Sequence, residues 1–359
     1  MDAVDDRTSS REFGVYLHVP FCSRRCDYCA FATWADRHHL QQSYMEALLA
    51  DVRRADLTPV TSVFVGGGTP TLVDPHLLAA VLRAIPTVVG AEITVECNPD
   101  DVTPELLQVY ADAGVNRVSI GVQSMVPHVL ASLGRSHTPD NVRRSVEAVR
   151  KVGIPTFNLD LIYGAAGETL DDWRTTLQQA VDVGPTHVSA YALTIEAGTP
   201  LAADESRHPD DDDLADKYEL TDDLLVAAGL ANYEVSNWAV SGHECRHNRL
   251  YWAQGDYAGF GSAAHSHRGG RRWWNIRTPE RYISVVQQGG STEAGAEDLD
   301  AETRRVEGLQ LRLRMREGIP ADSIDLDGLE GLVEIHDDTA ILTRRGRLLA
   351  NEVSLRIRG

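Results

Sequence analysis

Short apolar, β-branched runs alternate with helix-like segments along the first half of the chain. The runs that read as strands are residues 15–19, 61–65, 93–97, 117–123, 156–163 and 187–193. Between them, apolar residues recur at helical spacing in residues 40–52, 141–152 and 170–183. This alternation predicts parallel βαβ units with right-handed crossovers. We therefore expect an α/β fold with a partial (β/α)6 barrel, whose ligand sites lie at the carboxyl ends of the strands.

Three cysteines follow the first predicted strand at spacings of four and three. Cys22, Cys26 and Cys29 lie in a loop that can turn three sulfurs toward one point, as a metal or cluster site requires. Four thiolates would complete the shell of a structural zinc ion, whereas three leave one metal position open for another ligand. The spacing therefore favours a cluster with an open position.

A structural zinc site is the alternative for this loop. Zinc usually takes four protein ligands, and no second cysteine pair is present, since Cys97 and Cys245 are isolated in the sequence. His18 or His38 could complete a Cys3His set. Spacing alone leaves this alternative open.

The string Tyr-Leu-His-Val-Pro-Phe-Cys at residues 16–22, with Cys26 and Cys29, resembles the cluster loop of the radical SAM superfamily. Gly-Gly-Gly-Thr-Pro-Thr at residues 66–71 is similar to the branch that contains oxygen-independent coproporphyrinogen dehydrogenases (HemN) and heme chaperones (HemW). The resemblance implies a [4Fe–4S] cluster on the three thiolates and S-adenosylmethionine (SAM) chelated to the fourth iron. In such proteins one electron from the cluster cleaves SAM, and the protein supplies orientation and excludes water.

Polar residues gather near the ends of successive predicted strands. They are Gly67, Thr69, Glu96, Gln123, Arg135 and Asp160. Each residue alone could be a helix cap or an ion-pair partner. A charged side chain buried at a core strand is costly unless it is paired, however, and five strands in succession that end in such residues point to one shared pocket. The resemblance implies that Tyr16, Gly67 and Glu96 contact a first SAM, with Glu96 on its ribose. It implies that a second SAM would meet Gly68, Thr69, Gln123, Arg135 and Asp160.

A second motif, Cys-Arg-His-Asn-Arg-Leu-Tyr-Trp, occupies residues 245–252. An imidazole is a common axial ligand of heme iron, and aromatic faces suit a flat macrocycle, but such residues could equally pack a domain junction. The pattern HNxxYW resembles the heme-binding string of the HemW branch, which implies heme contacts by His247, Asn248, Tyr251 and Trp252. Cys245 is a rival iron ligand.

The remainder of the chain lacks strand–helix alternation. Residues 279–286 and 301–315 read as helices, and residues 340–343 and 353–356 as a small hairpin. This combination predicts a small C-terminal helical, winged-helix-like domain. We expect four parts: a tail (1–12), the barrel domain (13–235), a heme-motif connecting segment (236–272) and the C-terminal domain (273–359).

The net charge of −19 repels phosphate backbones, so nucleic acid is not an expected partner. No apolar run approaches the about 18 residues of a membrane-spanning helix. Five cysteines, three of them clustered, suit a reducing cytoplasm. An acidic run at residues 208–213 precedes a predicted helix at 214–228 and reads as helix capping and solvation.

Three functions are compatible with these features. The first is a heme chaperone that passes heme to apo-hemoproteins; the others are a coproporphyrinogen III dehydrogenase and a catalytically silent scaffold. Phe31 stands where the dehydrogenase has a further cysteine, and only residues 1–13 precede the first strand, so the long substrate cover expected of the dehydrogenase is absent. We therefore expect the chaperone, with an electron donor and peripherally approached membrane-bound acceptors as further partners. Whether SAM is cleaved, and whether the protein is a monomer or a homodimer, stay open.

Overall fold

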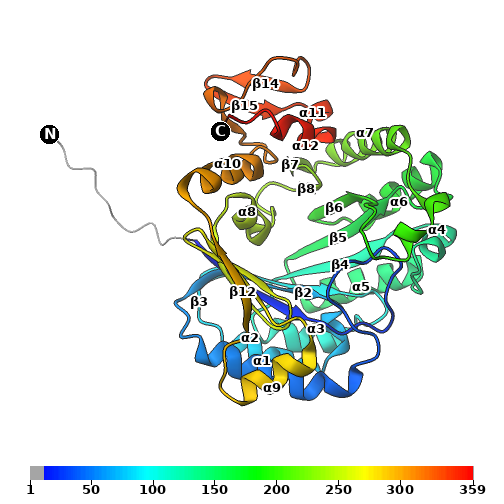
Figure 1. The fold of residues 1–359 in the computed structure, drawn as a ribbon. Helices are drawn as coiled ribbons and strands as arrows, with labels where there is room; N and C mark the ends of the chain where they lie inside the picture. Colours follow the sequence, from blue (N-terminus) through cyan, green and yellow to red (C-terminus); the bar gives the residue numbers. More distant parts are fainter. Residues whose placement is uncertain (1–11, 359) are drawn as a thin grey trace.

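The computed structural model describes residues 12–358, so the predicted tail falls almost entirely outside the described residues. Six parallel strands pair in sequence order, as the alternation predicted (Figure 1). They are β1 (Phe13–Val19), β2 (Val60–Gly67), β3 (Thr87–Cys97), β4 (Arg117–Gln123), β5 (Thr156–Tyr163) and β6 (His187–Ala192). The α/β fold with a partial barrel of six parallel strands is therefore confirmed.

Helices cover the outer face of this sheet. They are α1 (Gln41–Arg54), α2 (Pro75–Arg83), α3 (Pro104–Ala111), α4 (Pro127–Ser132), α5 (Pro139–Val152), α6 (Leu170–Asp182) and α7 (Asp211–Ala227). Their starts follow local chemistry: Thr138 and Thr169 each close a capping box. The acidic run also acts as predicted, because Asp210 accepts a hydrogen bond from the backbone N–H of Asp213 at the start of α7.

The sheet continues beyond both edges of these six strands. β8 (Asn237–Ala239) and β7 (Ala231–Glu234) follow β6, while β9 (Asp256–Phe260), β10 (His265–Arg268), β11 (Arg271–Asn275) and β12 (Glu293–Asp298) extend from β1. The strand β12 was not predicted from the sequence. Its residues carry no apolar alternation, because β12 is an edge strand whose side chains are largely exposed and often charged. α9 (Pro279–Gln287) packs against α1.

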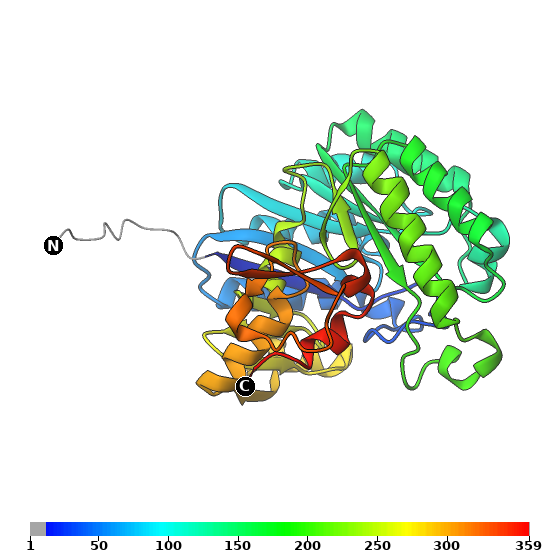
Figure 2. The same ribbon diagram turned by 90° about the horizontal axis from the view of Figure 1, so that it is seen from above.

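A smaller antiparallel sheet lies in the C-terminal part, where β15 (Thr339–Leu342) pairs with β13 (Ile319–Pro320) and β14 (Val333–His336). α10 (Ala301–Arg312), α11 (Arg344–Leu348) and α12 (Ala350–Ser354) accompany it. The predicted strand at residues 353–356 was wrong, because Ala350 and Val353 are buried three residues apart on one helical face. Figure 2 shows this part lying beside α10, and ion pairs from Arg344 and Arg347 of α11 join it to Asp223 and Asp222 of α7.

The strands separate apolar from polar side chains. Val15, Leu17 and Val19 of β1 are fully buried in the main core. Alternate residues point the other way, toward the inner face, where α8 (Arg246–Trp252) packs against β1 and β2 (Figure 1). Among the described residues, no helix has the length and apolar character needed to cross a bilayer.

The close approach of α8 depends on Gly14. A Cβ at this position would lie 2.6 Å from Leu250 Cδ2 and 3.0 Å from His247 Cε1. We expect Gly14→Val to lower the free energy of unfolding by about 1–3 kcal/mol through overpacking, measured by denaturant titration. Ala253→Val, at an exposed position just after α8, is the control and should change stability little. Equal stability of the two variants would show that α8 moves away from β1 without cost.

Candidate functional site

The inner face of the barrel carries a network of paired polar side chains. Ser119 Oγ donates to Asp160 Oδ2 at 2.6 Å, and Asn158 Nδ2 donates to Asp160 Oδ1 at 2.8 Å. His187 Nδ1 lies 2.7 Å from Asn158 Oδ1, and its Nε2 lies 2.8 Å from the hydroxyl of Tyr233. Buried polar groups are costly unless hydrogen-bonded, so these contacts hold β4, β5 and β6 in register around Asp160.

Two predicted site carboxylates lie on this face. The backbone N–H of Gly67 donates to Glu96 Oε2 at 3.2 Å. Burial, followed by the nearby charge of Asp160, raises the pKa of Glu96 to about 8. Burial also raises the pKa of Asp160, against the hydrogen bonds from Ser119 and Asn158. Asp160 thus lies close enough to Glu96 for its charge to influence the ionisation of Glu96.

Tyr16 is joined to the cysteine loop through His18. The hydroxyl of Tyr16 lies 3.0 Å from His18 Nδ1, and His18 Nε2 lies 2.9 Å from the backbone oxygen of Ala32. Burial lowers the pKa of His18 to about 4, which keeps the ring neutral at pH 7. Both ring nitrogens of His18 are therefore engaged, which counts against its role as the fourth ligand of a zinc ion.

The three thiols are half-buried in a loop whose ends are fixed to the barrel. The backbone N–H of Cys22 donates to Trp34 O at 3.1 Å, and Thr69 Oγ1 lies 3.7 Å from Cys22 Sγ. Burial raises the pKa of Cys22 and Cys29, to which the neighbouring thiols also contribute. The loop therefore keeps its sulfurs close together at the ends of β1 and β2.

No three His, Cys, Asp or Glu side chains within residues 12–358 converge on a single-ion site. Zinc needs its ligands around one ion, at about 2.0–2.3 Å from it. Cluster irons are separate atoms, so cysteines that bind different irons lie further apart. The donor set, three neighbouring thiols without a fourth ligand, thus fits an open iron–sulfur cluster better than zinc.

Arg135 connects the thiols with the strand ends. Its Nη2 donates to Asn98 Oδ1 and to Gly121 O, both at 3.0 Å, and its Nη1 lies 3.9 Å from Cys26 Sγ. Gln123, where the pairing of β4 with β5 shifts register, has a φ of 61°. A left-handed conformation is unfavourable for a non-glycine residue and tends to occur where function requires it.

The HNxxYW motif forms α8, and its members face two ways. His247 is fully buried, with Nδ1 2.9 Å from Ser62 Oγ and Nε2 2.9 Å from the hydroxyl of Tyr251. Burial lowers the pKa of His247 to about 3, so the imidazole is neutral. Tyr251 packs edge-on against Tyr257 with 4.6 Å between ring centroids. These two motif residues belong to the barrel interior.

Trp252 points to the C-terminal part instead. The guanidinium of Arg314 stands over its ring at 5.9 Å, whereas Asn248 is half-buried on the same helix. The structure thus separates Trp252 from His247 and Tyr251. The rival ligand Cys245 is buried, with its Sγ 3.5 Å from Glu92 Oε1, and burial together with Glu92 raises the pKa of this thiol to about 12. A protonated thiol is a poor iron ligand, so His247 is the better candidate.

The sequence interpretation missed the residues that hold the candidates in place. They are Asn98, Ser119, Asn158 and His187, together with His18, which the sequence analysis considered only as a zinc ligand. A usable signal was present, because Ser119 and Asn158 are polar residues at alternate positions of otherwise apolar strands. Such a pattern indicates an inward polar face.

Fold and site together define the class of protein. The model of the Radical SAM superfamily matches residues 16–180. A solved structure of coproporphyrinogen III oxidase (HemN) from Escherichia coli superposes with a TM-score of 0.84 over 98% of this chain and 91% of that chain. At 22% identity this likeness shows the fold.

Curated relatives narrow the class further. A heme chaperone HemW from Mycobacterium tuberculosis (strain H37Rv) is 42% identical over 95% of this chain and 93% of its own length. A heme chaperone HemW from Escherichia coli (strain K12) is 35% identical over 94% of this chain and 96% of its own length. The chain therefore belongs to the HemW family of radical SAM proteins.

The ionisation of Glu96 provides a test of the site geometry. Its pKa of about 8, against an ordinary value of 4.5, means that the folded chain keeps a proton that the unfolded chain loses. Its contribution to stability is complete below about pH 4.5 and is lost as the pH rises toward 8. In the metal-free protein, the free energy of unfolding should therefore fall by up to about 1.4 kcal/mol per pH unit because of Glu96. The Glu96→Gln variant should lack this part of the decline. Denaturant titrations from pH 5 to 8 measure it.

Glu105→Gln, which changes an exposed carboxylate at the start of α3, is the control. It should leave the pH dependence of the unfolding free energy as in the unchanged chain. Parallel stability curves for the unchanged chain and Glu96→Gln would mean that Glu96 is solvated rather than buried beside Asp160.

Proposed function

We propose that this protein is a heme chaperone that carries a [4Fe–4S] cluster and SAM in its barrel, binds heme, and passes it to apo-hemoproteins. The observation that carries the proposal is the 42% identity to a curated heme chaperone across 95% of the chain. Retention of three neighbouring thiols and of the complete HNxxYW motif supports it. We place the protein in the cytoplasm, with an electron donor and heme-acceptor proteins as partners, some of them membrane-bound.

The cluster would be held by Cys22, Cys26 and Cys29. The thiols neighbour one another at the strand ends, and Thr69 and Arg135 lie within reach of two of the sulfurs. When bound, the cluster would supply one-electron chemistry to SAM. The half-buried loop would limit access of water to the cluster.

SAM would occupy the inner face beside the thiols. Glu96 and Gly67 offer a carboxylate and a backbone amide, and Tyr16 lies on the neighbouring strand. A carboxylate suits ribose hydroxyls through charge-assisted hydrogen bonds. A second SAM would meet Gly68, Thr69, Gln123, Arg135 and Asp160. Hydrogen bonds to SAM would draw Glu96 toward its ionised form, which burial alone disfavours.

Heme would be ligated by His247 on α8. The ring is already neutral, as iron ligation requires, but its Nε2 lies 2.9 Å from the Tyr251 hydroxyl. Heme binding therefore requires Tyr251 to leave this hydrogen bond while Ser62 continues to orient Nδ1. Tyr251, Trp252 and Asn248, all half-buried, are the further proposed heme contacts, although Trp252 lies on the side of α8 that faces Arg314.

Iron content tests the cluster. The anaerobically reconstituted chain should hold about four irons, as one [4Fe–4S] cluster requires. The variant with Cys22, Cys26 and Cys29 all changed to Ala should lose them, as measured by iron analysis and the visible absorption spectrum. Cys97→Ala, which removes a buried isolated thiol, is the matched control and should keep its iron. Stoichiometric zinc in place of iron would overturn the cluster.

Two substitutions on α8 test the heme ligand. His247→Ala should weaken heme binding about tenfold or more, because the axial ligand is lost. Tyr251→Phe should not weaken ligation, because it frees Nε2 while keeping the ring. Titration followed by the Soret band measures both, with Tyr257→Phe on the neighbouring strand as control. Equal affinity of His247→Ala and the unchanged chain would assign the iron to another ligand.

The chaperone and the dehydrogenase differ in their products. The reconstituted chain, given SAM and a reductant without oxygen, is offered heme with an apo-hemoprotein and, separately, coproporphyrinogen III. We expect transfer of heme to the apoprotein and no protoporphyrinogen. Turnover of coproporphyrinogen III at 1–10³ s⁻¹, a typical enzymatic range, would refute the proposal. Phe31 supports the expected result, because this side chain is 66% exposed at the cysteine loop and offers no further thiol.

A further inference from the structure

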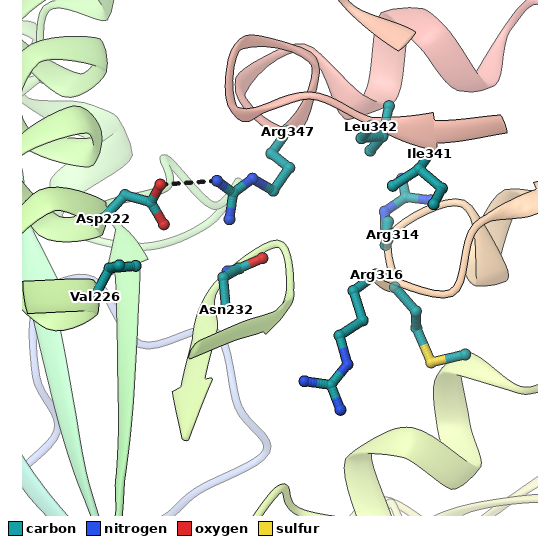
Figure 3. A pocket seen from close by; sticks show the side chains of 9 residues that line it. Asp222, Val226, Asn232, Arg314, Arg316, Ile341, Leu342 and Arg347 are labelled. Atoms are coloured by element: carbon teal, nitrogen blue, oxygen red, sulfur yellow. Dashed lines mark hydrogen bonds and ion pairs between the residues drawn. The ribbon is translucent and has the colours of Figure 1, made fainter. Parts of the chain in front are cut away.

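A cavity of about 270 Å³ lies where the barrel meets the C-terminal part. α7, β7, the turn after α10, β15 and α11 all contribute to its walls (Figure 3). Its walls include three arginines and several apolar side chains: Arg314, Arg316, Arg347, Val226, Ile341 and Leu342. Asp222 also lines the cavity, so three arginines and one carboxylate face it in a chain of net charge −19.

Two of these arginines are already paired. Arg347 Nη2 lies 2.9 Å from Asp222 Oδ2, and the two side chains are only 13% and 12% exposed. Arg316 Nη2 lies 2.9 Å from Glu244 Oε1. These pairs neutralise two of the three cations and fix their guanidinium groups at the walls.

Arg314 has no such partner in the described chain. Its guanidinium donates to Asn351 Oδ1 at 2.7 Å and to the backbone oxygen of Gln310, and it lies over the ring of Trp252. Burial lowers the pKa of Arg314, and Glu234 offsets this in part. The carboxyl of Glu234 is itself buried, which raises its pKa to about 7, so its negative charge is incomplete near neutral pH. Unlike the other two arginines of the cavity, Arg314 makes no ion pair within 4.0 Å among the described residues.

We propose that this cavity binds a carboxylate on a short alkyl stem, with Arg314 as the principal anchor. A guanidinium fork matches a carboxylate, and the apolar side chains of Val226, Ile341 and Leu342 suit methylene groups, which inorganic phosphate lacks. The volume is too small for a porphyrin but admits one of its propionate arms. The carboxylate belongs either to a heme propionate or to a free dicarboxylate. The first alternative rests on the proposed heme function, because Arg314 stacks on Trp252 of the HNxxYW motif.

Calorimetric titration of the full chain with glutarate tests the site, with inorganic phosphate as the comparison probe. Glutarate should bind saturably, and phosphate should bind more weakly. Arg314→Gln should weaken glutarate binding about tenfold or more, as expected for a charge-assisted contact. Arg345→Gln is the matched control, because Arg345 lies on the same small helix α11 as Arg347 but is exposed and outside the cavity. It should bind glutarate as the unchanged chain does.

A second variant tests the site without removing Arg314. Val226 is 54% exposed at the cavity wall, so Val226→Glu should fold normally and place a competing carboxylate beside the arginines. Glutarate affinity should again fall about tenfold or more. Absence of saturable glutarate binding, or unchanged affinity in both Arg314→Gln and Val226→Glu, would overturn the proposal.

The source is identified by comparing heme with its dimethyl ester. Tighter binding of heme than of the ester, with the difference lost in Arg314→Gln, assigns the cavity to a propionate. Equal binding of heme and ester, with saturable glutarate binding, assigns it to a free dicarboxylate. A chain that binds glutarate but no heme refutes the proposed function while supporting the carboxylate site.

Discussion

Each parallel strand of this barrel separates apolar from polar side chains, and the candidate site depends on that separation. Apolar residues such as Val15 and Leu17 are buried against the outer helices, while alternate positions face inward. Inward polar groups are tolerable only when paired, which the contacts among Ser119, Asn158 and Asp160 achieve. The network that stabilises the barrel therefore also positions the carboxyl group of Asp160 on its inner face.

The conformation of the cysteine loop is fixed by contacts with other segments rather than by secondary structure of its own. His18 fixes it from β1 through Ala32 O, and Thr69 reaches Cys22 from the end of β2. Asp27 is held by Arg207, 3.0 Å away, from the segment after β6. Because these contacts come from different segments, a shift of any one of them alters the geometry of the thiols.

The helix α8 joins three regions within seven residues. His247 is tied to β2 through Ser62, Tyr251 packs on Tyr257 of β9, and Trp252 lies under Arg314 of the C-terminal part. A ligand that takes the imidazole must displace the Tyr251 hydroxyl, so binding on this helix has consequences inside the barrel. The same helix lies between that interior and the arginine-lined cavity, because its Trp252 packs under Arg314.

The sequence by itself determined the six parallel strands, the helix caps and the positions of the cysteines, because these follow from local periodicity and short-range chemistry. It could not determine β12, whose charged residues form a strand only by pairing with β11, nor the helix at 350–354, whose short apolar pattern suits either structure. The sequence also could not determine the directions in which the HNxxYW side chains point. Only the tertiary structure, through the close approach of α8 to Gly14, decided that His247 is buried and hydrogen-bonded while Trp252 faces Arg314. Contacts between residues far apart in sequence depend on packing, which local pattern does not encode.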